Sequence, residues 1–345
     1  MELFLGILLV SLGGIVMGGL GWPMKLMKKL QFEHWWFIGM LFGLFIIPWI
    51  ITLTFCPNAI QAYKTVDTAV LIKSNLFSLC WGIANVLLGI CFVRIGIALS
   101  FAILTGVGVS LGVTIPMVFK GSGLFSNAAD LNSPAGKMIL ISIMVMIVGI
   151  VFVALAGFGR ERMLKQSNQK TGGFLGGLIM CLIAGVLSAG ISFAFVYSQG
   201  PIVDAMKANG ASDVPANISV WAIGLLAGGL VNILYPAFLM TKKKSWYVLV
   251  SSAKEVGLAI IIGINFIVAV TLLGKGMLLI GALGASIGFG IQQAMQILGG
   301  QTVGFISGEW KGINGKPIKQ MVIAIIILIC AVLIMAYGNT LPKTL

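Results

Sequence analysis

Long apolar stretches of about 18–24 residues alternate along this chain with short polar connections. A stretch of that length crosses roughly 30 Å of hydrocarbon when it is helical. Membrane β-barrels instead show short alternating segments, and these runs do not alternate. The pattern therefore predicts an all-α polytopic membrane protein with about ten transmembrane helices. The predicted helices lie near residues 3–23, 35–55, 69–92, 96–118, 138–158, 173–198, 217–240, 255–273, 277–304 and 320–338.

Basic residues gather in every second gap between these helices, which predicts the orientation of the chain. The richer gaps hold 14 of them, against 6 in the other gaps and at the C-terminus. Short loops rich in Lys and Arg stay in the cytoplasm, so both termini are expected on the outer side of the inner (plasma) membrane. The cytoplasmic set is Lys25, Lys28, Lys29, Arg94, Arg160, Arg162, Lys165, Lys170, Lys242, Lys243, Lys244, Lys311, Lys316 and Lys319.

The composition agrees with burial in a lipid bilayer and excludes several other classes. Of the 345 residues, 59% are hydrophobic and 9% are charged, whereas soluble domains contain about 25% charged residues. The net charge of +13 lies in interhelical loops, so orientation explains it and nucleic acid is not an expected partner. The five cysteines show no metal or disulfide spacing, and no metal or cofactor is expected.

The two halves of the sequence resemble each other weakly. Residues 14–22 match residues 185–193 at an offset of 171, and each segment opens a block of five predicted helices. Two halves of five helices have opposite orientations in the membrane. The sequence therefore predicts inverted repeats, residues 1–170 and 171–345, of the kind that surround a midplane substrate site in transporters.

Polar residues inside membrane helices usually face the bundle interior or an aqueous cavity. The helix over 69–92 carries Ser74, Ser78, Trp81 and Asn85 on one face, because their spacings are 4, 3 and 4. An indole and an amide one turn apart are suited to a sugar or similar polyol. Hydrogen bonding to neighbouring helices is the alternative.

Further polar residues are candidates for the same pathway. Three glutamines within five residues of one helix are unusual, and amides both donate and accept hydrogen bonds. The alternative is that they bond neighbouring helices, and that the serines of the sixth helix, like its glycines, allow close packing. The additional candidates for substrate binding are Ser188, Ser192, Asn232, Asn265, Gln292, Gln293 and Gln296.

Few charged residues fall within the predicted helices. Lys73 lies about one turn into its helix and Glu255 at the start of another, and both are candidates for ion coupling. Interfacial positions are the alternative for both, because a lysine stem can snorkel to the membrane surface. No carboxylate is predicted at the middle of the bilayer.

Several segments resemble the L-rhamnose–proton symporter family over nearly the whole chain. This family belongs with the drug/metabolite transporter superfamily, whose larger members have ten helices in two inverted five-helix repeats. The resemblance implies a secondary transporter for a sugar, with proton coupling. The segments that carry it are 18–25 (GGLGWPMK), 81–85 (WGIAN) with Arg94 and Gly96, 188–194 (SAGISFA), Gly228–Gly229 with Asn232, and Glu309–Trp310 with Pro317.

The function that this resemblance implies is cation-coupled uptake of L-rhamnose or a related monosaccharide by alternating access, with proton symport favoured. A sodium-coupled or uncoupled permease or exporter for another polar metabolite, such as a ureide or nucleobase, is the alternative. An enzyme is not expected, because one histidine and no buried acid pair offer little catalytic chemistry.

Overall fold

The computed structural model describes residues 2–118, 130–166, 173–280, 288–338 and 340–342. Every regular element in this part of the chain is a helix, as the apolar pattern predicts. Among these residues, seven helices are long and apolar enough to cross a membrane, or up to eight if the bent pair Asp213–Gly224 and Leu226–Lys243 is one span. The all-helical membrane class is confirmed, whereas ten spans in two inverted repeats stays a prediction.

The chain forms two compact units, and each is built from both halves of the sequence. The first unit comprises Met1–Gly19, Cys91–Val186 and Gly276–Leu345. The second comprises Leu20–Ile90 and Leu187–Lys275. The predicted repeats 1–170 and 171–345 concern relatedness of sequence rather than compactness, so they too stay a prediction.

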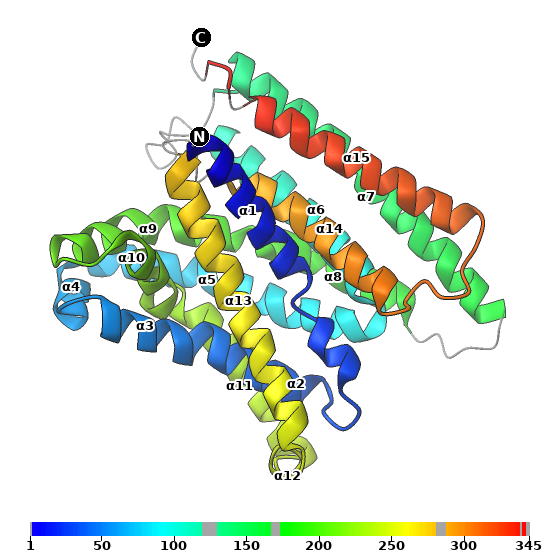
Figure 1. Ribbon diagram of the computed structural model, residues 1–345, viewed down its shortest axis with the longest axis horizontal. Helices are drawn as coiled ribbons and strands as arrows, with labels where there is room; N and C mark the ends of the chain where they lie inside the picture. Colours follow the sequence, from blue (N-terminus) through cyan, green and yellow to red (C-terminus); the bar gives the residue numbers. More distant parts are fainter. Residues whose placement is uncertain (1, 119–129, 167–172, 281–287, 339, 343–345) are drawn as a thin grey trace. The chain divides into compact units, whose positions relative to one another are not determined.

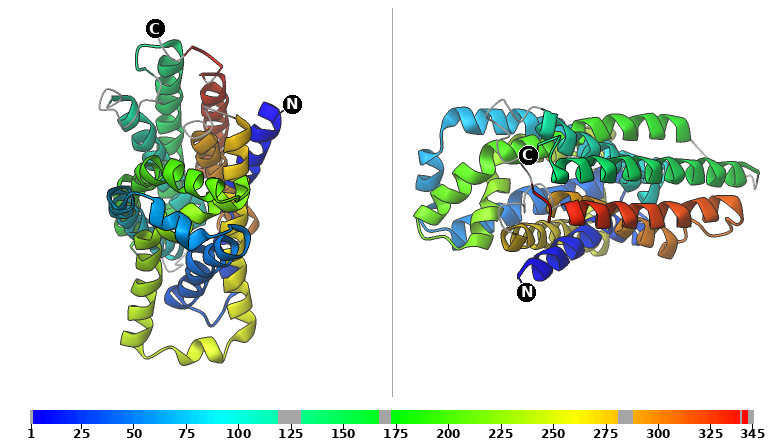
Figure 2. Two further views of the ribbon diagram at one scale, coloured as in Figure 1. Left: turned by 90° about the vertical axis from the view of Figure 1, so that its left-hand side faces the viewer. Right: turned by 90° about the horizontal axis from the view of Figure 1, so that it is seen from above.

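In the first unit, two long apolar helices pack along each other. Helix α15 lies beside α7 in both views (Figure 1, Figure 2). Ser142 on α7 donates a hydrogen bond to the carbonyl oxygen of Ala331 on α15 at 2.9 Å. The other faces of the pair expose apolar side chains such as Met144 and Leu333, as lipid contact requires. The helices of this unit are α1 (Glu2–Gly18), α6 (Ile97–Val118), α7 (Pro134–Gln166), most of α8 (Phe174–Ser188), α14 (Phe289–Ile306) and α15 (Lys316–Gly338).

Glycines bring α1 and α14 into backbone contact. A methyl group on Gly14 would collide with the carbonyl oxygen of Gln292, and one on Gly18 with that of Gln296. Membrane helices use small residues in this way, because lipid provides no hydrophobic force that holds helices together. The glycine-rich start of the chain is thus a packing surface.

The second unit holds the remaining helices. Helices α11 and α13 form a hairpin through the short α12 (Figure 2). Tyr63 on α4 donates a hydrogen bond to the carbonyl oxygen of Ser219 at 2.7 Å, and burial raises the pKa of this phenol. The elements are the 3₁₀ turn η1 (Trp22–Leu26), α2 (Phe32–Met40), the π-helical η2 (Leu41–Ile46), α3 (Ile47–Phe55), α4 (Ala59–Thr65), α5 (Thr68–Arg94), α9 (Gly190–Ala208), α10 (Asp213–Ser219), the π-helical η4 (Val220–Gly224), α11 (Leu226–Lys243), α12 (Tyr247–Val250) and α13 (Ala253–Ile280), whose end enters the first unit.

The structure corrects several of the predicted helices. Helix α9 continues through Pro201 to Ala208, because membrane helices tolerate an internal proline when other groups satisfy the freed backbone. Helix α13 passes the predicted end at 273 and reaches Ile280, so Lys275 lies on the helix. The predicted helix over 217–240 is broken at Leu225. Residues 281–287 of the predicted ninth helix, and residues 119–129 between the predicted fourth and fifth helices, lie outside the described residues.

Candidate substrate site around a broken helix

The polar face of α5 meets the break in the second unit. The two helices on either side of Leu225 differ in direction by 59°. Leu225 itself has φ −118° and ψ 19°, which are not helical angles. A break of this kind leaves carbonyl and N–H groups without intrahelical partners, and in a membrane protein they need partners from elsewhere.

Two side chains of α5 satisfy the carbonyl groups that end η4. Ser74 donates a hydrogen bond from Oγ to the oxygen of Gly224 at 2.6 Å. Asn75 donates from Nδ2 to the oxygen of Ile223 at 2.9 Å. Both contacts therefore cap the helix before the break.

The same face of α5 satisfies the N–H groups that begin α11. The N–H of Ala227 donates to Oδ1 of Asn75 at 2.8 Å. The N–H of Gly228 donates to Oγ of Ser78 at 3.1 Å. These side chains are short, so they reach only because Gly82 and Gly228 let the two backbones touch. Asn75 thus holds both sides of the break.

An amide next to the break is fully bonded. Oδ1 of Asn232 accepts from the indole N–H of Trp36 at 3.0 Å and from Nδ2 of Asn85 at 3.2 Å. Its Nδ2 donates to the carbonyl oxygens of Gly82 at 3.2 Å and Gly228 at 2.8 Å. An amide can make about four hydrogen bonds, so Asn232 joins α2, α5 and α11 and orients Asn85.

Aromatic rings surround Trp221, the second residue of η4. Trp221 lies edge-on to Trp81 at 5.8 Å, to Phe195 at 5.3 Å and to Phe266 at 5.1 Å between ring centroids. These rings come from α5, α9 and α13. Within the described chain, the indole N–H groups of Trp81 and Trp221 and the Oδ1 of Asn85 have no protein hydrogen-bond partner. Apolar surfaces with a few polar groups are typical of small-molecule sites.

The two predicted serines lie where α8 gives way to α9. The helix is interrupted at Ala189, and a methyl group on Gly190 would collide with the carbonyl oxygen of Phe77 on α5. Ser188 is buried. The buried Oγ of Ser192 has no hydrogen-bond partner among the described residues. Their role in binding stays a prediction.

The remaining predicted amides differ in position. Asn265 is half-buried on α13, next to Phe266 of the aromatic cluster. Gln292 and Gln296 are buried and Gln293 is half-buried on α14, which belongs to the first unit. No described residue forms a side-chain hydrogen bond with these three glutamines, so their binding role also stays a prediction.

Both residues predicted to couple ions, Lys73 and Glu255, have interaction partners within the protein. The ammonium of Lys73, an exposed residue, lies 5.7 Å from the ring centroid of Tyr197, a cation–π distance. The carboxylate of Glu255 accepts N–H groups of residues 28, 29 and 30 at 3.0, 2.9 and 2.8 Å. Both arrangements agree with interfacial positions.

Three residues of this unit were not predicted from the sequence. Asn75 directly follows a serine that was selected by its spacing, and it is the residue that bonds both sides of the break. Trp221 lies in an apolar run with no sign of a break. Glu33 is buried at the start of α2 and pairs with Lys243 at 2.9 Å. The adjacency of Asn75 to Ser74 was a usable signal, whereas Trp221 and Glu33 carried none.

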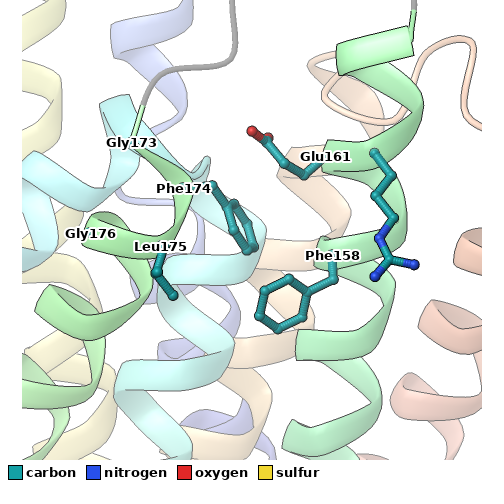
Figure 3. Close-up of a pocket in the computed structure, with 7 residues that line it drawn as sticks. Phe158, Glu161, Gly173, Phe174, Leu175 and Gly176 are labelled. Carbon is teal, nitrogen blue, oxygen red and sulfur yellow. The ribbon is translucent and has the colours of Figure 1, made fainter.

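A separate pocket of about 400 Å³ lies in the first unit, at the ends of α7 and α8 (Figure 3). The rings of Phe158 and Phe174 meet edge-on at 5.1 Å beside it. Its lining is mainly apolar, with Glu161 and Arg162 as the charged members. None of the predicted site residues lines it, and it lacks the amides that suit a hydroxylated solute.

The comparisons with known proteins agree with one another. A family model described as L-rhamnose-proton symport protein matches residues 2–340. The L-rhamnose-proton symporter of Pectobacterium atrosepticum is 27% identical over 325 residues, which cover 92% of each chain. The symporters of the same name from Pectobacterium carotovorum and Yersinia pestis are each 26% identical, again over 92% of both chains.

Replacing Asn75 should destabilise the protein more than replacing an asparagine whose side chain forms a single hydrogen bond. Asn75→Ala leaves the N–H of Ala227 unpaired and removes one of the two donors to the oxygen of Ile223, which costs about 2 kcal/mol in buried surroundings. Asn209→Ala is the control, because Asn209 bonds only the oxygen of Ala205 at the end of α9. Thermal unfolding in detergent should show a clearly lower midpoint for Asn75→Ala alone. Equal midpoints for the two variants would contradict the capping role.

Proposed function

The chain belongs to the L-rhamnose-proton symport protein family and is a multi-pass membrane transporter rather than an enzyme, and we propose that it takes up L-rhamnose or a related monosaccharide together with a proton. The observation that carries the proposal is the cluster of indoles and amides around a broken helix. In transporters, substrate sites are typically formed where a membrane helix is discontinuous.

The chemistry of this cluster suits a neutral, hydroxylated solute. Trp81 and Trp221 offer apolar ring surfaces and indole donors, and Asn85 offers a carbonyl acceptor. The ring and hydrogen-bond partners described above for these three residues are all uncharged. Ser188, Ser192, Asn265 and the α14 glutamines are proposed as further contributors, on the basis of their polarity within membrane helices.

Alternating access is the proposed mechanism, and corresponding interruptions in the two halves support it. At the offset of 171 residues, Gly18 corresponds to Ala189. Helix α1 ends at Gly18, and the α8–α9 helix is interrupted at Ala189. The second helix of each half also contains a π-helical segment, η2 or η4. These shared irregularities favour the two inverted repeats, whose rocking exposes a site to each side in turn.

Transport itself is the first test. In proteoliposomes with an inward proton gradient, labelled L-rhamnose should accumulate above its external concentration, because downhill proton entry drives it. Collapse of the gradient with a protonophore should abolish accumulation. Parallel arms with a sodium gradient, and with a ureide or nucleobase as solute, distinguish the alternatives. Accumulation driven by sodium alone, or no transport of any sugar, would contradict the proposal.

Trp81 should contribute to sugar affinity. Trp81→Leu removes a ring surface and a donor, and we expect the KM for the sugar to rise about tenfold, which corresponds to about 1.4 kcal/mol. The control is Trp246→Leu, because Trp246 is exposed and bonds Thr241 beyond the broken-helix cluster. The measurement is initial uptake rate against sugar concentration. An unchanged KM for Trp81→Leu would remove this indole from the proposed site.

The proposed orientation places both termini on the outer side of the inner membrane. It rests on the excess of basic residues in alternate loops. A reporter that is active only in the cytoplasm should be silent when fused after residue 345 and active when inserted near Lys28. Activity at the C-terminus would reverse the topology.

A further inference from the structure

The pocket at the ends of α7 and α8 contains none of the residues proposed to bind the sugar (Figure 3). Its volume of about 400 Å³ is within the range of small-molecule sites, which is about 300–1,000 Å³. A methyl group on Gly173 would meet no described residue within 4 Å, so no described side chain fills the space beside it. The pocket therefore has room for a ligand other than the transported solute.

The apolar wall of the pocket continues onto the exposed surface of the same two helices. The rings of Phe158 and Phe174 meet edge-on in the wall (Figure 3). Phe158 and Leu175 line the pocket and are exposed, and about one turn further along their helices so are Leu155 and Ile179. Residues three or four apart share a helix face. A hydrocarbon chain can therefore lie along this surface and end in the pocket.

Two arginines border the pocket. Arg162 on α7 lines it, and Nη1 of Arg94 lies 3.9 Å from the position that a Cβ atom on Gly176, another lining residue, would occupy. Both arginines are exposed, and within the described chain neither guanidinium forms a hydrogen bond or an ion pair with the protein. Their charges are therefore available to an anionic ligand.

The neighbouring charged residues are engaged elsewhere. Nη1 of Arg160 donates to a backbone carbonyl oxygen just after α5 at 3.2 Å, and its guanidinium lies 5.7 Å from the ring centroid of Trp310. Glu161, the one acidic residue of the lining, attracts Arg160. Arg94 and Arg162 outnumber this carboxylate, so the border of the pocket carries a net positive charge.

We propose that this pocket binds an anionic phospholipid of the cytoplasmic leaflet, with its phosphate at the two arginines and an acyl chain against Phe158 and Phe174. Guanidinium groups form strong, charge-assisted hydrogen bonds with phosphate oxygens. Basic pockets between membrane helices on the cytoplasmic side bind anionic lipid headgroups in this way. The proposed orientation places the ends of α7 and α8 on that side.

The apolar wall favours a lipid over a soluble phosphate. A soluble phosphate needs only the arginines and leaves the rings beside them exposed to water. A phospholipid covers those rings with its chain, and burial of apolar surface is favourable. A lipid in the pocket contacts both α7 and α8, so its binding stabilises the packing of these two helices.

Lipid binding in detergent solution tests the proposal, and the result does not depend on the proposed orientation. Phosphatidylglycerol should raise the thermal unfolding midpoint of the purified full chain, because a ligand that binds the folded state stabilises it. Phosphatidylcholine with the same acyl chains has no net charge and should raise it much less. Inorganic phosphate at the same concentration should not raise it. Equal effects of the two lipids, or stabilisation by inorganic phosphate alone, would overturn the proposal.

Substitution of the arginines tests their role. Arg162→Gln and Arg94→Gln should each weaken phosphatidylglycerol binding about fivefold, as expected for one basic residue at an anionic lipid. The double variant should retain one lipid fewer in native mass spectrometry. Lys319→Gln is the matched control, because Lys319 is an exposed cation near the start of α15 and does not line the pocket. Equal affinities of the arginine variants and the control would place the lipid elsewhere and overturn the proposal.

Phe158→Ala tests the apolar wall separately from the charges. It should also weaken phosphatidylglycerol binding, because the ring is part of the surface proposed to contact the acyl chain. Unchanged affinity in this variant would overturn the assignment of a lipid. These measurements require no sugar and no proton gradient, so failure of the proposed transport function leaves their outcome unaffected.

Discussion

Backbone groups inside a membrane must find partners in the protein, and the second unit is arranged around one place where the helix does not supply them. At Leu225 the chain leaves the helix, and α5 bonds the groups on both sides. Because the side chains that do so are short, α5 and α11 must touch. Glycines at 82 and 228 permit that contact, and the contact in turn brings Asn232 within reach of the oxygen of Gly82.

The polar groups at the break have hydrogen-bond partners in the protein, so nearby polar groups that lack such a partner are informative. Asn75, Ser78 and Asn232 direct their polar atoms to the protein itself. The indoles of Trp81 and Trp221 sit beside them, with N–H groups that bond no described residue. Burying an unpaired donor costs free energy, and a polar ligand that accepts its hydrogen bond would offset that cost. The residues that bond the groups at the break are thus different from those proposed to bind the solute.

The spacing of polar residues in the sequence was sufficient to predict much of the polar face of α5. The intervals between Ser74, Ser78, Trp81 and Asn85 follow from helix geometry, and the structure places all four toward η4 and α11. The break itself was not predictable, because residues 220–225 are apolar and contain no proline. It depends on caps supplied by α5, some 150 residues earlier in the chain. Glu33 was missed for a related reason, since an acid in a first helical turn is usually an exposed favourable charge.

The four points at which the chain passes between the two compact units differ in local structure. It crosses at residues 19–20, 90–91, 186–187 and 275–276. The first and third crossings lie within a few residues of the interruptions after Gly18 and at Ala189. The second and fourth lie inside the continuous helices α5 and α13. Helix α5, which contains the second crossing, also carries the groups that cap the break and Trp81, so the same helix belongs to both units and to the proposed sugar site.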